Sequence, residues 1–446
     1  MSFQRRATLL GSSEMVNSLE FEGNDSSILS QPTRKMKLLL VTYDTFPPFR
    51  VDISVLFGKK LKQGGHHIDL LCQSETACAA SYETTWAGGR AFIGRTHTGD
   101  CFLNRGLKNI CRIIHELKLI FFALRNRYDI ILVKDLFFSA LVALLAAKLL
   151  GFKFVYWLSF PFPEASLYQV QQGTSRYPFI SILTGHITRF LLYTFILRFS
   201  SHSLVQSDQM KKEFVARGIS ADTMTSVPMG VEVNEIPYFG YTFDTLDTTA
   251  HRTIVYLGAL SRARRLDFLL RSFHLLLKEK PNVTLYLVGG GYETGDEEAI
   301  LQYADKLGIR DKVVVTGFLP QKAALEYARD AALCVSPIDP SPMHWPSSPT
   351  KLIEYMAMGK AVVANDLPEQ KAVLDYSQAG LCVPYEEQAF SIAMAFLLNN
   401  LREAELMGIR GRRFVQERRS YDRISYMLEQ VLLNLVQKDE DIGNSL

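Results

Sequence analysis

Short apolar runs alternate with helical patterns along most of the chain. The first half contains the runs 36–42, 68–72, 128–133 and 154–158, and the second half contains 253–257, 284–288, 312–316, 332–336 and 361–364. Strands of nearly continuous apolar character that alternate with helices are typical of parallel sheets covered on both faces. The pattern therefore predicts an α/β protein with two doubly wound, Rossmann-like domains that face each other across a cleft.

The length of 446 residues also favours two domains, because single cores rarely grow beyond roughly 250–300 residues. We expect a disordered leader at 1–35, an N-terminal domain at 36–240, a C-terminal domain at 241–420, and a closing helix in 421–446 that packs back on the N-terminal domain. The leader is polar and rich in Ser and Asn, and no secretory segment is recognisable in it.

Three apolar segments need a separate interpretation. The segment 136–150 is shorter than the roughly 20 residues that cross a bilayer, so we expect a buried helix there. The segments 108–127 and 180–199 interleave Lys and Arg with large apolar residues, which is the pattern of a basic amphipathic helix. Two interpretations stay open for both: a helix packed on the sheet with a solvated basic face, or contact with an anionic membrane surface.

The charge distribution and the cysteines indicate which partners, metals and cellular location to expect. The net charge is only +3, but residues 101–200 carry 12 Lys and Arg against 4 Asp and Glu, so one region favours anionic partners. The six cysteines are scattered, with no Cys-x-x-Cys pair and no His at metal-ligand spacing. We therefore expect a cytoplasmic protein that contains no metal and no resident cofactor, with peripheral contact with the inner face of a membrane as an open alternative.

The segment 347–364 predicts a loop, a helix and a strand. Pro349 suits the first turn of a helix, where its missing N–H costs nothing, and the free N–H groups of Thr350 and Lys351 then point away from the sheet. Such a helix start binds phosphate oxygens, and the Lys351 side chain adds a full positive charge. Glu354 follows within about one turn and can accept hydrogen bonds from ribose hydroxyls. A surface carboxylate is the alternative for this residue taken alone, but its place in this loop favours a function.

Three further elements follow predicted strands. Gly258 is followed by Arg262, Arg264 and Arg265, and a glycine before basic residues at a strand end is what phosphate capture at a sheet edge requires. Glycines 289–291 let the backbone approach a ligand, with a simple turn as the alternative. Gly317 and Phe318 offer a flat contact for a nucleobase, where a packed Phe is the alternative.

The order of these motifs resembles the C-terminal half of glycosyltransferase family 4, the retaining enzymes with the GT-B fold. The match rests on Gly258 to Arg264, LVGGG at 287–291, VTGF at 315–318 and SPTKLIEYMAMG at 348–359. The first half is similar through MKLLLVTYDTFPPF at 36–49 and VPMGV at 227–231. The resemblance implies a donor site formed by Gly258, Arg262, Arg264, Gly289, Gly290, Gly317, Phe318, Pro349, Thr350, Lys351 and Glu354.

The resemblance also assigns roles and reveals departures. It implies that Arg264 and Lys351 meet the donor diphosphate and that Glu354 holds the ribose. The family's first signature Glu falls at Pro346, so Asp339 or His344 would have to replace its contact with the transferred sugar. In the N-terminal domain, Ser159 stands where many relatives have His, and Glu164 is a second candidate on the acceptor or sugar side.

We therefore expect a metal-independent enzyme that moves a sugar, with retention, from a nucleotide-diphosphate donor to an acceptor hydroxyl. The acceptor would be a glycan, a lipid-linked molecule or a small molecule, as in polysaccharide biosynthesis. The alternative is a catalytically lapsed subunit that binds a nucleotide-sugar or a partner. A dinucleotide-dependent oxidoreductase is disfavoured because no G-x-G-x-x-G follows residue 41, and nothing resembles a nucleic-acid-reading motif, so we expect no nucleic-acid partner.

Overall fold

The computed structural model describes residues 34–443, apart from residues 77, 79, 97–101 and 242–252. Residues 35–446 group into one compact unit by their contacts. The predicted leader at 1–35 lies outside the described residues except for its last two positions. So do residues 242–252, near the start of the predicted C-terminal domain.

The first sheet contains eight strands. Their order is β3-β4-β2-β1-β5-β6-β7-β8, and all neighbours are parallel except the antiparallel pair β3–β4. The bounds are β1 Lys37–Phe46, β2 His67–Ser74, β3 Tyr82–Trp86, β4 Gly88–Gly94, β5 Ile130–Lys134, β6 Lys153–Leu158, β7 His202–Val205 and β8 Met224–Ser226. The sheet is buried at its centre because β1, β5 and β6 are apolar on both faces, as a covered parallel sheet requires.

The second sheet is wholly parallel, in the order β11-β10-β9-β12-β13-β14. Its strands are β9 Thr253–Leu257, β10 Thr284–Val288, β11 Val313–Val315, β12 Leu333–Ser336, β13 Val362–Asn365 and β14 Gly380–Val383. Counted along the chain, this is the 3-2-1-4-5-6 order of dinucleotide-binding folds, in which ligands bind beyond the carboxyl ends of the strands where the order reverses. That point lies between β9 and β12, and the prediction of two doubly wound sheets is confirmed.

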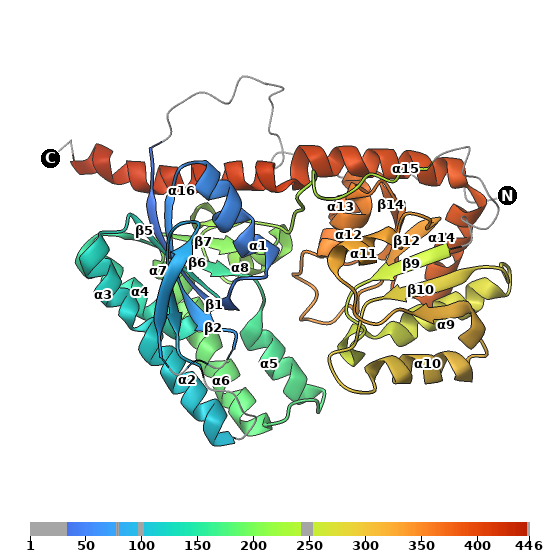
Figure 1. Cartoon of the computed structure of the whole chain (residues 1–446), viewed down its shortest axis with the longest axis horizontal. Coiled ribbons are helices and arrows are strands. Elements are labelled where there is room, and N and C mark those ends of the chain that lie inside the picture. The colour runs from blue at the N-terminus through green and yellow to red at the C-terminus, as the bar shows by residue number, and fades with distance from the viewer. Residues whose placement is uncertain (1–33, 77, 79, 97–101, 242–252, 444–446) are drawn as a thin grey trace. The chain divides into compact units, whose positions relative to one another are not determined.

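Helices connect the strands of both sheets (Figure 1). Those of the first half are α1 Val51–Ser54, the π-helical η1 Leu56–Leu61, α2 Phe102–Glu116, α3 Lys118–Asn126, α4 Phe137–Leu150, α5 Phe162–Gln171, α6 Pro178–Leu191, the π-helical η2 Leu192–Ile196, α7 Leu197–Phe199 and α8 Asp208–Ala216. Those of the second half are α9 Leu266–Leu277, α10 Asp296–Lys306, α11 Gln321–Glu326, α12 Thr350–Ala357, α13 Pro368–Ser377, α14 Glu387–Asn399, α15 Leu401–Phe414 and α16 Tyr421–Gly443.

Two helix predictions need correction. The single basic helix expected at 108–127 is broken at Leu117 into α2 and α3. The segment 136–150 does form a helix, α4, but that helix is not buried on all sides. Its small residues Ala140 and Ala143 pack inward, whereas Leu145 and Leu149 are 65% and 84% exposed. Leu144 joins these small residues in the core, so α4 buries one face and leaves Leu145 and Leu149 on the opposite face.

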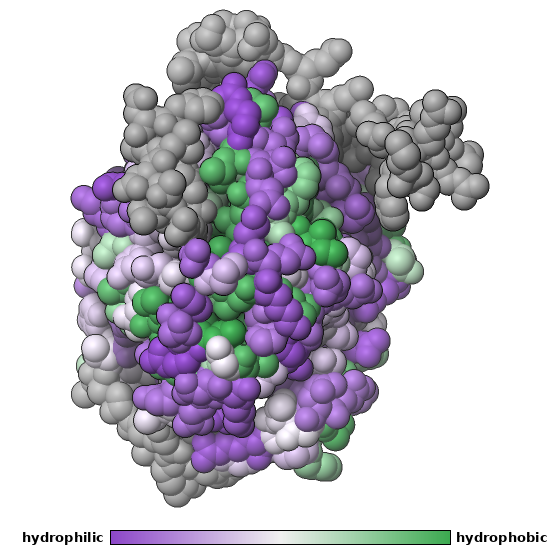
Figure 2. Space-filling model, turned by 90° about the vertical axis from the view of Figure 1, so that its right-hand side faces the viewer, coloured by the Kyte–Doolittle hydropathy of each residue, from purple (hydrophilic) through white to green (hydrophobic). Residues whose placement is uncertain are grey.

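Apolar side chains cover both faces of each sheet. The last helix, α16, contributes to the core of the first sheet, because Ile424, Leu428 and Leu432 belong to the same buried cluster as Leu38 and Leu40 of β1. The surface seen in Figure 2 is mostly hydrophilic and carries small hydrophobic groups, which is ordinary for a folded protein.

Candidate active site

Helix α12 begins at Thr350, directly beyond the point where the order of the second sheet reverses. Pro349 is the residue before the helix rather than part of its first turn as predicted, and its extended backbone (φ −77°, ψ 114°) sets the direction of entry. No side chain caps this helix start. The N–H groups of Thr350, Lys351 and the next residue are therefore left for a ligand, with the positive end of the helix dipole behind them.

The ammonium group of Lys351 lies against two residues of the β9 end. Its Nζ is 3.9 Å from the centre of the Tyr256 ring, a cation–π contact. A Cβ added to Gly258 would lie only 3.3 Å from the same Nζ. Lys351 therefore reaches from α12 to the strand end that the sequence predicted as the other half of the phosphate site.

The pKa of Lys351 is lowered well below its usual value, first by burial and then by the positive charge of Arg264. Arg264 acts on Tyr256 as well, although burial dominates there and raises the pKa of that phenol to about 12. These mutual effects mean that the two predicted diphosphate ligands lie near one another. Within the described residues no carboxylate forms an ion pair with either of them, so an anion would relieve their repulsion.

The three arginines after β9 have different partners. Arg262 forms an ion pair of 3.6 Å with the buried Asp296, and Arg265 is bonded to Asp267 at 3.2 Å. The exposed side chain of Arg264 has no such partner among the residues that the structure describes. Of the three, Arg264 is the one whose charge is available, which agrees with its predicted role on the donor.

Glu354 follows Lys351 by three positions and lies on the same side of α12. Its Oε1 accepts a hydrogen bond of 3.1 Å from Gln321 Nε2 at the start of α11. Burial raises the pKa of Glu354, while Gln321 and Lys351 oppose that shift. Gln321 was not predicted as a site residue, because an isolated glutamine at a helix start carries no sequence signal.

Glycines bring the loops after β9, β10 and β11 together. A Cβ on Gly289 would lie 2.0 Å from the carbonyl oxygen of Gly258, and its φ of +146° also favours glycine. Gly289 also bridges to Gly317, which places the β11 loop beside it. The Phe318 side chain is 87% exposed, so the alternative of a packed Phe is wrong and the ring is available for a flat ligand.

Glu297 of α10 is an unpredicted neighbour of these loops. Its Oε1 accepts a hydrogen bond of 3.2 Å from the Gly291 N–H, and a Cβ on Gly290 would lie 3.3 Å from the same oxygen. A carboxylate beside Phe318 and exposed backbone could accept hydrogen bonds from a nucleobase.

The position of the missing family Glu is occupied by a short turn. His344 Nδ1 lies 3.1 Å from both Ser341 Oγ and the Asp339 carbonyl oxygen. Burial, followed by the charge of Arg264, lowers the pKa of His344. His344 is thus close to Arg264, which the sequence could not show. The charge of Asp339 acts on the pKa of His344 and also on the pKa values of Arg265 and Tyr385.

The loop before α12 is attached to the first half of the chain. Ser207 Oγ donates a hydrogen bond of 2.6 Å to the Pro346 carbonyl oxygen, and Ser348 Oγ accepts one of 3.0 Å from the Met229 N–H. The carbonyl oxygen of Pro346, at the position of the family's first Glu, is therefore used in this connection between the two halves.

In the first sheet, Ser159 lies directly after β6 among charged residues that the sequence analysis missed. Asp135, directly after β5, accepts hydrogen bonds from both the N–H and the Oγ of Ser159, and Arg50 Nη2 lies 3.3 Å from that Oγ. Asp135 has a left-handed backbone (φ +61°), and burial raises its pKa. Residues 50, 135 and 159 are far apart in sequence, and only the sheet order brings them together.

This polar group extends to β1. Buried Lys134 is bonded to Asp52, and its Nζ lies 4.5 Å from the centre of the Trp157 ring. Asp44 at the end of β1 is 9% exposed, its Oδ2 has no hydrogen-bond partner, and burial raises its pKa. We call Asp44, Arg50, Asp52, Lys134, Asp135 and Ser159 the N-terminal polar cluster.

Glu164 forms its hydrogen bonds with residues outside the N-terminal polar cluster. Its Oε1 accepts hydrogen bonds from Tyr193 at 2.8 Å and from Arg217 at 3.0 Å, which join α5 to η2 and to the end of α8. One oxygen of Glu164 is therefore already used in packing helices, and its role towards an acceptor stays a prediction.

A metal-binding cluster of three or more His, Cys, Asp or Glu side chains does not occur among the described residues. The cationic groups that converge near the β9 end are Arg264, Lys351 and the start of α12. They can neutralise a diphosphate directly.

Known families match both halves of the chain. Residues 251–400 match the family described as glycosyl transferases group 1, and residues 55–235 match the family described as Glycosyltransferase Family 4. An uncharacterized glycosyltransferase of Haemophilus influenzae is 29% identical over 154 residues, which are 34% of this chain and 40% of that relative.

Solved structures share the architecture. Sucrose-phosphate synthase from Thermosynechococcus elongatus superimposes with a TM-score of 0.68 at 17% identity, covering 91% of this chain and 100% of that one. HepE of Anabaena in complex with UDP-glucose gives 0.61 at 16% identity, covering 89% and 99%. WaaG, a glycosyltransferase involved in lipopolysaccharide biosynthesis, gives 0.62 at 14%, also covering 89% and 99%.

These matches define the class of protein. The two doubly wound sheets form the GT-B fold, as the resemblance implied. The two family matches cover separate parts of the chain, so its first half contains a Glycosyltransferase Family 4 domain and its second half a glycosyl transferases group 1 domain.

Proposed function

We propose that this protein transfers a sugar from a nucleotide-diphosphate donor to an acceptor hydroxyl, with retention of anomeric configuration and without a metal. The observation that carries the proposal is the meeting of Lys351, Arg264 and the uncapped start of α12 beyond β9. Neighbours in structure support the donor class, since HepE is solved with UDP and with UDP-glucose.

In the proposed reaction, the bond from the anomeric carbon to the diphosphate oxygen breaks and a bond to the acceptor oxygen forms. The acceptor proton passes to an oxygen of the leaving diphosphate. Negative charge grows on that diphosphate, and Lys351, Arg264 and the α12 amides stabilise it. The uncapped start of α12 and the nearness of the two cations support this role. Glu354 holds the ribose, and Phe318 with Gly317 contacts the base.

The acceptor is proposed to bind at the N-terminal polar cluster, at the strand ends of the other sheet. A buried carboxylate with an unpartnered oxygen, Asp44, suits a hydroxyl donor such as a sugar. A glycan, a lipid-linked molecule or a small molecule would all present that hydroxyl. We further propose that the protein works in the cytoplasm, against the inner face of a membrane.

The experiment is a screen of nucleotide-sugars for release of nucleoside diphosphate, followed by NMR of the anomeric proton in the product. An axial donor giving an axial product supports retention, and inversion would remove that part of the proposal. The second candidate, a lapsed subunit, is favoured by Pro346 and Ser159 at positions where the family has Glu and His. Tight nucleotide binding without transfer or hydrolysis would select it.

A further inference from the structure

Helix α6 is apolar, yet almost none of it is buried. Of its 14 residues only Gly185 is buried, where it packs close to Leu167 of α5. Phe179 is 78% exposed and Phe190 59%, and Ile180, Leu183 and Ile187 are each between 45% and 51% exposed. Folded proteins rarely present so much continuous apolar surface to water without a partner.

Adjoining helices continue this surface. Helices α3 and α4 and the segment η2 pack their inner residues into one core cluster beneath the sheet, and α4 contacts α2, α3 and η2 (Figure 1). Their outer residues include Ile114, Phe121 and Leu124 at 54–60% exposed and Leu149 at 84%. We call α2, α3, α4, α6, η2 and α7 the apolar helical layer.

The charge on this layer has one sign. The four acidic residues of 101–200 are Glu116, Asp129, Asp135 and Glu164, and none of them is exposed. The exposed charged side chains are all basic: Lys108, Lys118, Arg125, Arg127, Lys148, Arg176, Arg189 and Arg198. A surface that combines large apolar groups with only positive charge is complementary to an anionic lipid surface.

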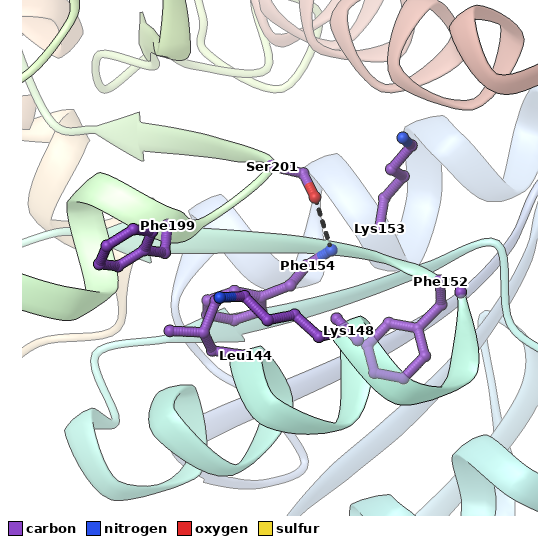
Figure 3. Close-up of a pocket in the computed structure, with 9 residues that line it drawn as sticks. Leu144, Lys148, Phe152, Lys153, Phe154, Phe199 and Ser201 are labelled. Carbon is purple, nitrogen blue, oxygen red and sulfur yellow. Dashed lines mark hydrogen bonds between the residues drawn. The ribbon is translucent and has the colours of Figure 1, made fainter. Parts of the chain in front are cut away.

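A small open pocket lies within the layer, between the end of α4 and α7 (Figure 3). Its volume is about 230 Å³, and Lys148 reaches across it to a point 5.0 Å from the centre of the Phe199 ring. Exposed Leu145 and Leu149 lie on the same helix as Lys148. A cation beside exposed apolar side chains is the arrangement expected at the boundary between headgroups and acyl chains.

We propose that the apolar helical layer docks in the plane of an anionic bilayer, with α6 inserted to the depth of its exposed side chains. This inference deepens the membrane location given under the proposed function, on which it rests, by naming the surface and the lipid charge, and it is independent of the donor chemistry. The layer lies on the first sheet, whereas the donor residues belong to the second.

A membrane-spanning segment and a dimer through the apolar helical layer both fit these observations less well than docking in the plane of a bilayer. Residues Pro178–Phe199 are long and apolar enough to cross a membrane, with a mean hydropathy of 1.5 and 22% of the best 18-residue window buried. Leu192, Ile196 and Leu197 are nearly fully buried in the sheet core, however, so the second half of this segment cannot leave without opening that core. A second copy would bring Arg189 and Lys148 against like charges.

The test is sedimentation of the full chain with vesicles of phosphatidylcholine alone or mixed with phosphatidylglycerol. We expect binding only to the anionic vesicles, weakened by salt. The double variant Phe179→Asn, Phe190→Asn should bind roughly tenfold or more weakly. The double variant Lys148→Glu, Arg189→Glu should bind more weakly and with a reduced salt dependence, because six exposed basic side chains remain. Ile392→Asn, an equally exposed apolar position of α14, is the matched control and should bind normally.

Four results would overturn the proposal. They are no vesicle binding by the wild type, binding of wild-type strength by both double variants, a wild-type dimer that Phe179→Asn disrupts, and resistance to alkaline extraction from cell membranes, which would indicate a spanning segment. Nucleoside diphosphate binding without lipid should be unchanged in all variants, so loss of docking and failure of the proposed transfer are distinguishable.

Discussion

The Lys351 ammonium lies over the ring of Tyr256, 3.9 Å from its centre, and against the backbone of Gly258. This contact joins α12 to the end of β9, and Arg264 lies close enough to lower the pKa of Lys351. The ligand-free protein therefore holds a partly desolvated cation beside a second one. Such an arrangement costs stability and is suited to an incoming anion.

Replacing Lys351 with Met should stabilise the ligand-free fold by about 1 kcal/mol while abolishing most donor binding. The pKa of Lys351 is lower in the folded state than the usual 10.5. Between those two values the unfolded chain binds more protons, so the stability of the wild type rises with pH in that window. The gain from Lys351→Met should accordingly be larger at pH 7 than at pH 10, as measured by chemical denaturation. A variant less stable than wild type at pH 7 would refute this.

Arg264→Ala should weaken nucleotide-sugar use by roughly 10- to 100-fold, since a charge-assisted contact to the diphosphate is lost. The matched control is Arg265→Asn, because Arg265 is paired with Asp267 and asparagine tolerates its left-handed backbone (φ +49°). Steady-state kinetics with varied donor measure both. Equal losses in the two variants would mean that position 264 has no special role.

Glu354→Gln should raise the donor KM about tenfold, because a neutral amide holds ribose hydroxyls less strongly than a carboxylate. Burial raises the pKa of Glu354, so in the wild type donor affinity should fall as pH drops through that raised value, above the usual 4.5. The variant should lack this acid-side loss. Gln321→Ala, which removes only the neighbouring hydrogen bond, should have a smaller effect. A donor KM with the same pH profile in wild type and Glu354→Gln would contradict the assignment.

Asp135→Asn should lower kcat/KM for the acceptor by roughly tenfold or more and leave nucleoside diphosphate affinity unchanged. Asp135 positions Ser159 beside Arg50, and asparagine keeps its left-handed backbone. Glu164→Gln provides the contrast: it should lower the melting temperature by weakening the bonds to Tyr193 and Arg217, with little change in acceptor KM. The reverse pattern would place the acceptor at Glu164.

Much of the fold followed from the apolar runs. The strands β9 and β10 lie where the sequence placed them, because buried parallel strands are apolar on both faces. The hairpin β3–β4 was missed, since β3 is mostly exposed and its sequence YETTW contains no apolar run. Helix α13 was missed for a similar reason, because its sequence PEQKAVLDYS has little apolar periodicity.

Most residues of the proposed donor site could be predicted from the sequence, whereas the N-terminal polar cluster could not. Arg264 and Lys351 each lie in a local motif whose chemistry can be read from neighbouring residues. Sequence could not show that Arg262 and Arg265 are paired while Arg264 is available. In the N-terminal polar cluster, Asp44, Arg50 and Asp52 are close in sequence, but no pattern there indicates a site. Asp135 and Ser159 join them only through the order of the strands.

The central claim is that Lys351 and Arg264 bind a diphosphate together. Isothermal titration calorimetry with UDP and with ADP, on wild type and on the double variant Arg264→Ala, Lys351→Met, tests it most directly. We predict salt-sensitive binding of at least one nucleotide to the wild type and a loss of roughly 100-fold or more in the double variant. Binding of equal strength in the two proteins would contradict the account.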